Sequence, residues 1–102
     1  MENQKKENKI NIELPEDIAE GLYSNLAIIT HSTSEFVCDF VQMMPGMPKA
    51  KVRSRVVMTP ENAKRLLNAL QDNLRKYEAN IGKIEDKGGN QPPMNFGPPT
   101  EA

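Results

Sequence analysis

The segment from Thr59 to Gly82 constrains the fold more than any other, because it carries the signals of one long amphipathic helix. Thr59 is a good N-cap, Pro60 fits the first helical position, and Gly82 is a suitable stop. Apolar residues recur between them at steps of three and four: Ala63, Leu66, Leu67, Leu70, Leu74, Tyr77 and Ile81. We therefore expect a helix whose leucine stripe packs on one face of a sheet.

The residues before this helix predict a small antiparallel meander. Residues 10–14 alternate apolar and polar side chains, which indicates a short strand, and residues 16–20 follow a proline as a single helical turn. Three further strands, separated by turns rich in Ser, Pro and Gly, are expected over residues 22–31, 35–43 and 49–58. The predicted fold class is α+β, with three to four antiparallel strands and one long C-terminal helix packed on one sheet face.

The 102 residues form one predicted domain between two tails. Residues 1–9 are almost wholly Lys, Glu, Asn and Gln, and residues 83–102 are rich in Pro and Gly, so both tails are expected to be disordered. The ordered domain then spans residues 10–82. No stretch is long and apolar enough for a bilayer, no signal-like run opens the chain, and the single cysteine cannot form an internal disulfide. We expect a cytoplasmic protein without membrane association.

Strand pairing decides which side chains share a sheet face. Pairing Leu26 with Phe40 in the first hairpin places the aromatic residues and Cys38 on the face that the helix covers. The opposite face then carries an apolar cluster where an antiparallel sheet with one solvated face would be polar. This cluster is the candidate interface of a homodimer or higher oligomer: Ala27, Ile29, Val37, Val41 and Val57.

The strand over residues 49–58 carries a basic ribbon, which we define as Lys49, Lys51, Arg53 and Arg55. Because strand side chains alternate, all four cations are expected on the same face as the apolar cluster, with Asp39 beside them as a partner for one. Three interpretations stay open: a solvated or self-paired face, a docking surface for an acidic protein, and a nucleic-acid site. The net charge of −1 and the lack of aromatic residues near the ribbon make nucleic acid the weaker alternative.

The sequence offers little chemistry. His31 is the only histidine and is expected to be a turn residue, and Cys38 is expected to be a small buried hydrophobic side chain. One His and one Cys cannot make a zinc site, the acidic residues lack the spacing of a calcium loop, and no glycine-rich phosphate loop is present. We therefore expect no catalytic, cofactor-binding or metal-binding residue, and a protein that is not an enzyme.

Three short motifs carry a family resemblance. The sequence reads YSN at Tyr23–Asn25, HSxxEF at His31–Phe36 and TPxxAKxL at Thr59–Leu66. In combination they resemble a prokaryotic family known as domain of unknown function 3467, and the segment from Met43 to Arg55 is similar to the version in Bacteroides-type bacteria. The resemblance implies a small cytoplasmic protein-interaction module with no catalytic residues to carry over.

The same resemblance suggests a partner. Genes of this family in Bacteroides-like genomes lie near those for the large RNA polymerase subunits, which implies an accessory role in the transcription machinery. RNA polymerase is then a candidate partner, beside a second copy of the chain. The candidate partner-binding residues are the basic ribbon and two arginines of the exposed helix face: Lys49, Lys51, Arg53, Arg55, Arg65 and Arg75.

Overall fold

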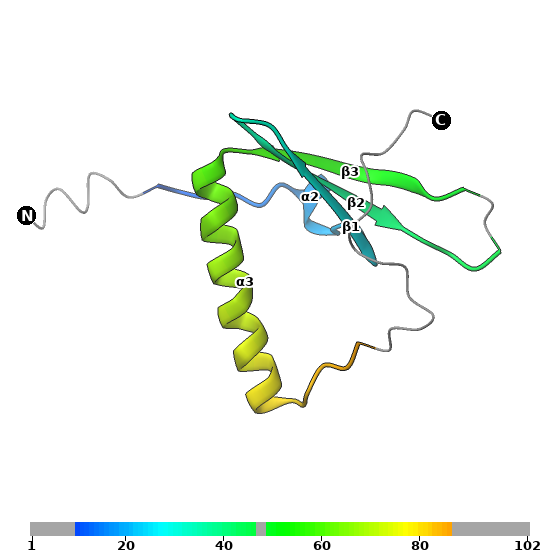
Figure 1. Cartoon of the computed structure of the whole chain (residues 1–102), viewed down its shortest axis with the longest axis vertical. Helices are drawn as coiled ribbons and strands as arrows, with labels where there is room; N and C mark the ends of the chain where they lie inside the picture. Colours follow the sequence, from blue (N-terminus) through cyan, green and yellow to red (C-terminus); the bar gives the residue numbers. More distant parts are fainter. Residues whose placement is uncertain (1–9, 47–48, 87–102) are drawn as a thin grey trace, which may run out of the picture.

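The computed structural model describes residues 10–46 and 49–86, which form a three-stranded sheet and two helices (Figure 1). The predicted α+β class is confirmed. The elements in chain order are helix α2 (Glu16–Ala19), strand β1 (Leu26–His31), strand β2 (Phe36–Gln42), strand β3 (Lys51–Met58) and helix α3 (Pro60–Asn80). The predicted strand over residues 10–14 does not form, because no other strand lies beside it to complete a hydrogen-bonded ladder. The predicted tails fall largely on residues 1–9 and 87–102, outside the described residues.

The sheet is the predicted antiparallel meander, with the strand order β1-β2-β3. Its first hairpin turns through four residues, since His31 pairs with Phe36 and the Ser32 amide donates to the Glu35 carbonyl at 2.8 Å. The Ser32 hydroxyl oxygen also accepts from the amides of Ser34 and Glu35, at 3.3 and 3.2 Å. These bonds fix both the length of the loop and the register that follows from it.

The predicted register of this hairpin is wrong by one residue. Leu26 lies opposite Val41 rather than Phe40, and Ile28 lies opposite Asp39. A shift of one residue exchanges the two faces of a strand, because side chains alternate along it. The two faces are therefore Leu26 and Ile28 with Val37, Asp39, Val41, Arg55 and Val57, and Ala27 and Ile29 with Phe36, Cys38, Phe40, Val56 and Met58.

The apolar core of the described residues is small. Leu26, Ile28 and Val41 form one buried cluster, between 3% and 7% exposed, with Met43 packed against it. Cys38 is buried on the opposite face, which confirms its predicted packing role. Four buried apolar side chains are few for a domain of this size, since short chains bury a low fraction of their surface even when fully packed.

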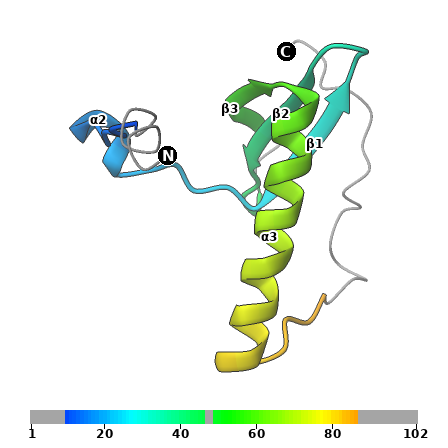
Figure 2. The same cartoon turned by 90° about the vertical axis from the view of Figure 1, so that its left-hand side faces the viewer.

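Helix α3 begins and ends close to the predicted positions. The Thr59 hydroxyl oxygen accepts from the Asn62 amide at 3.1 Å, Pro60 occupies the first turn, and the Ile81 amide donates to the Tyr77 carbonyl at 2.7 Å. The predicted packing of this helix on the sheet is wrong, however. No residue of α3 is buried, and Figures 1 and 2 show the helix running away from β3 and extending past the sheet.

The connection between β3 and α3 explains why the helix leaves the sheet. Thr59 alone separates the last residue of β3 from the first residue of α3, and its backbone is extended, with φ −70° and ψ 156°. Loops that return a helix onto the sheet of its preceding strand usually have 2–6 residues. A connection of one residue is too short for that reversal, so α3 projects from the end of β3.

Candidate functional site

The apolar side of α3 is an uncovered surface of the described chain. We define the leucine stripe as the six residues of this side that are between 43% and 71% exposed: Leu66, Leu67, Leu70, Leu74, Tyr77 and Ile81. The polar side of the helix has ion pairs of its own, from Asp72 to Lys76 at 3.1 Å and to Arg75 at 3.7 Å. The apolar side, in contrast, has no other part of the described chain packed against it. An uncovered apolar face of this length indicates an interaction surface.

A second uncovered apolar surface lies on the segment before β1. We call residues 10–22 the arm; its apolar side chains Ile10, Ile12, Leu14, Ile18 and Leu22 are between 57% and 88% exposed. Within it, α2 is a single turn in which the Pro15 carbonyl accepts from the amides of Ile18 and Ala19. Gly21 ends this turn with φ +77°, a left-handed conformation that favours glycine. Figure 2 shows α2 held well to one side of the sheet.

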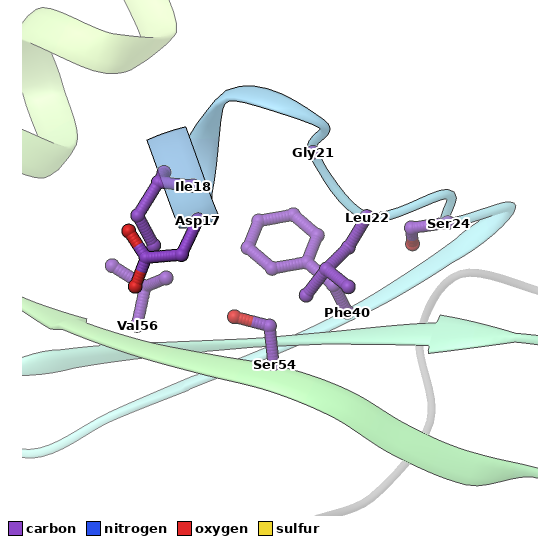
Figure 3. A pocket seen from close by; sticks show the side chains of 8 residues that line it. All are labelled: Asp17, Ile18, Gly21, Leu22, Ser24, Phe40, Ser54 and Val56. Carbon is purple, nitrogen blue, oxygen red and sulfur yellow. The ribbon is translucent and has the colours of Figure 1, made fainter. Parts of the chain in front are cut away.

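The arm and the sheet enclose a groove of about 510 Å³ between them. Figure 3 shows Ile18 and Leu22 of the arm facing Phe40 of β2 and Val56 of β3 across this space. The remaining residues of the lining are Asp17, Gly21, Ser24 and Ser54. The groove therefore opens over the sheet face that carries Phe36, Cys38 and Phe40, with apolar side chains on both of its walls.

The foot of the arm is fastened to the sheet by the residues of the YSN motif. The Ser24 hydroxyl lies 3.0 Å from the carbonyls of Leu26 and Val41. The Asn25 side chain accepts from the Met43 amide at 2.8 Å and donates to the Met43 carbonyl at 2.9 Å. The side-chain hydrogen bonds of these two residues continue the contact between β1 and β2 beyond the strand ladder. Their role is therefore structural, and they fix the point where the arm leaves the sheet.

The basic ribbon does not lie on one face, which corrects the sequence prediction. The register of β2 with β3 shifts between Phe40 and Val41, so Arg55 lies opposite Asp39 while Lys51 lies opposite Gln42. Asp39 and Gln42 point to opposite faces because they are an odd number of residues apart. An irregularity of this kind inserts one extra residue into a strand, which the alternation of the sequence does not reveal. Lys49 lies before the start of β3.

Arg55 is engaged inside the chain. Its Nε donates to Asp39 Oδ1 at 2.6 Å and a terminal nitrogen donates to Asp39 Oδ2 at 2.9 Å, a two-point contact with a fully buried carboxylate. The hydrogen bond to Asp39, and then the charge of Asp39, raise the pKa of the Arg55 guanidinium. The predicted cross-strand partnership with Asp39 is confirmed. Arg53 instead makes one exposed hydrogen bond, which it donates to the neutral Gln42 Oε1 at 2.5 Å.

The predicted oligomer cluster is also divided between the two faces. Ala27 and Ile29 lie on the face of the groove, while Val37, Val41 and Val57 lie on the other face. Val41 belongs to the buried core of the single chain and is not available to a partner. The cause is the register of the first hairpin, since one residue of difference moves every side chain of β1 to the other side of the sheet.

The remaining sequence candidates lie apart from the groove. Arg65 and Arg75 are exposed on α3, and His31 stacks on Phe36 with ring centres 5.1 Å apart. Burial, and then the charge of Asp39, raise the pKa of the Cys38 thiol.

Within residues 10–46 and 49–86 no group of three or more His, Cys, Asp or Glu residues is placed to hold a metal ion. None of the helices described there could cross a membrane.

Sequence reasoning missed the groove, because it expected α3 to cover the sheet face over which the groove opens. It also assigned residues 10–14 to a strand rather than to an arm. The alternation of Ile10, Ile12 and Leu14 was a true signal of apolar side chains on one side of an extended segment. The strand assignment also needed a neighbouring strand, which the described chain does not supply. An extended apolar segment that lacks a neighbour in its own chain could have indicated an arm that contacts another molecule.

The comparisons with known proteins give one match. The model of a family described as protein of unknown function (DUF3467) matches residues 1–86, which covers the arm, the sheet and α3. No curated protein and no solved structure matches the chain.

The contact between Arg55 and Asp39 predicts a strong effect of one arginine on stability. Arg55→Ala leaves a fully buried carboxylate without its partner, so we expect the thermal midpoint to fall by roughly 5 °C or more. Arg53→Ala, two residues away, is the matched control and should change the midpoint by less than about 2 °C, because it removes an exposed contact only. Equal midpoints for the two variants in thermal melts would contradict the assigned role of Arg55.

The burial of Cys38 predicts a slow thiol. Because its pKa is raised, the thiol stays protonated at pH 8 and is a poor nucleophile. We expect its reaction with a chromogenic disulfide reagent to be on the order of 100-fold slower in the native protein than in denaturant. A native rate that matches the denatured rate would show that Cys38 is accessible.

Proposed function

We propose that this chain, which belongs to the family described as protein of unknown function (DUF3467), is a small homodimeric protein-interaction module and not an enzyme. The observation that carries the proposal is the leucine stripe of α3, which no part of the described chain buries. The protein would act in the bacterial cytoplasm, with the stripe as the centre of the interface between two copies.

The energy available from the stripe supports a dimer in which both copies contribute a helix. Full burial of one large apolar side chain is worth roughly 1.5–3 kcal/mol, so covering six side chains that are about half exposed gives about 5–9 kcal/mol per helix. Association itself costs about 4–15 kcal/mol in lost freedom, which one helix alone barely offsets. Two symmetric helices double the gain, and twofold pairs are the commonest soluble assembly.

The cations that have no ion pair among the described residues suggest where a further partner would bind. Arg55 is engaged with Asp39, and Arg75 with Asp72, whereas the structure gives Lys49, Lys51 and Arg65 no such contact in the part of the chain that it describes. We propose that these three exposed residues contact an acidic protein at two places, through Lys49 and Lys51 at the start of β3 and through Arg65 on α3. The family resemblance suggests a component of the transcription machinery, RNA polymerase, as that protein.

Direct nucleic-acid binding is the alternative that loses support. It needed the four cations of the basic ribbon on one face, where their charges would add along a phosphate backbone. The register shift in β3 separates Lys51 from Arg55, and Arg55 is held by a buried carboxylate. No observation on the described residues favours this alternative over protein binding.

The dimer proposal predicts the effect of a charge in the stripe. Wild-type protein should sediment with about twice the 11.4 kDa mass of one chain at micromolar concentration, whereas Leu70→Glu should sediment as a single chain. Asn68→Glu places the same charge on the polar side of α3 and should stay dimeric. Circular dichroism of each variant reports whether α3 is retained. A wild-type protein that sediments as one chain would overturn the proposed function.

The docking proposal predicts salt-sensitive binding to purified RNA polymerase. We expect the double variant Lys51→Glu and Arg65→Glu to bind at least about 10-fold more weakly than the wild type at low salt, because two attractive charges become repulsive. Arg53→Ala is the control, since its guanidinium is already engaged with Gln42. Absence of wild-type binding at low salt would exclude polymerase as the partner and leave the dimer untouched.

A further inference from the structure

The groove between the arm and the sheet is built as a site for something apolar. Ile18 and Leu22 face Phe40 and Val56 across it, and both walls keep their apolar side chains exposed or half-buried (Figure 3). Its lining has three polar side chains, of which Ser24 has its hydroxyl engaged with two backbone carbonyls, while Asp17 and Ser54 come from opposite walls. A pocket for a small polar ligand would offer several unengaged polar groups that converge on one point. The lining instead favours an apolar filler.

The arm holds this space open. The turn of α2 and the left-handed Gly21 set the backbone of the arm apart from the sheet, so that Ile18 faces the sheet across the groove. Ser24 and Asn25 fasten the end of the arm to β2. Figure 2 shows the arm projecting to one side of the sheet. The arm is therefore attached to the sheet at Ser24 and Asn25, while the rest of the groove is open to an inserted element from another molecule.

The same chain carries an apolar element that needs cover. The leucine stripe spans sixteen residues, from Leu66 in α3 to Ile81 at its C-cap, which is about 24 Å of helix at 1.5 Å per residue. The chain cannot bring this stripe into its own groove, because the single residue Thr59 directs α3 away from the sheet. One unfilled groove and one uncovered helix in each copy match each other when two copies combine.

We propose that the groove of each copy seats side chains from the leucine stripe of helix α3 of the other copy. The arm of one chain then closes over the helix of its partner, and a twofold axis gives both grooves an occupant with the same set of contacts. This inference rests on the proposed homodimer and adds to it the surface that receives the helix. It also assigns a role to Ile18 and Leu22 of the arm, which a simple helix-to-helix dimer would leave in water.

The inference can be tested by photocrosslinking from inside the groove. A photoreactive benzoylphenylalanine replaces Ile18 in one preparation, which is unfolded together with an equal amount of ¹⁵N-labelled unmodified chain and refolded. After irradiation, mass spectrometry identifies the crosslinked peptides and their isotope content. The matched control carries the same group in place of Glu20, which is exposed, is close in sequence and does not line the groove.

We expect the Ile18 probe to attach to peptides of α3 that contain the stripe, with about half of the adducts carrying ¹⁵N, since half of the partners in a random pairing are labelled. The Glu20 probe should give few such adducts. If none of the adducts to α3 carried ¹⁵N, the helix would reach the groove of its own chain, and the inference would be overturned. Adducts to any other segment, or no adducts from a protein that sediments as a dimer, would contradict the seating of α3 in the groove. Either result would leave the proposed dimer unaffected. A single-chain mass for the wild type would reject both.

Discussion

The connection of one residue between β3 and α3 is the constraint on which the rest of the structure depends. Thr59 caps the helix with its hydroxyl while its backbone is still extended, and Pro60 starts the helix at once. The cap and the proline therefore fix the start of α3 at a point where no loop remains for a reversal of direction. The helix leaves the sheet, and both the stripe and the groove stay uncovered in the single chain.

Because of this constraint, the single chain buries little apolar surface to stabilise its fold. Three apolar residues of the buried cluster and Cys38 are the only apolar side chains that the described residues bury, while two long apolar surfaces stay in water. A chain of this size with so small a core is expected to depend on association for much of its stability, so its folding free energy will depend on protein concentration. Among the single-chain contacts, the buried carboxylate of Asp39 with Arg55 stands out, because it ties β2 to β3 beside the register shift.

The sequence predicted the elements better than their mutual arrangement. The bounds of α3, the order of the meander, the burial of Cys38 and the pairing of Asp39 all follow from local signals or strand alternation, and the structure confirms them. The predicted register of β1 with β2 was wrong because the register depends on whether the first loop has four residues or five. The alternation of apolar residues is compatible with both lengths. The prediction that the basic ribbon lies on one sheet face was wrong because one extra residue in β3 interrupts the alternation of side chains. Nothing in the sequence indicates that extra residue.

The site was harder to predict for a different reason. An amphipathic helix requires a cover for its apolar side, yet the pattern is the same whether the cover comes from the same chain or from another. Only the distance between the last strand residue, Met58, and the first helical residue, Pro60, distinguishes the two cases, and that distance is itself visible in the sequence.

If α3 is seated in the groove of a second copy, the polar side of the helix becomes the outer surface of the dimer. Arg65 would then be displayed twice, related by the twofold axis, with the ion pairs of Asp72 beside it. Two copies of a weak docking surface on a rigid dimer bind a partner with two acidic sites far more tightly than either surface alone, because the second contact forms at high effective concentration. Dimerisation would thus supply both the missing core and the avidity that a small interaction module needs.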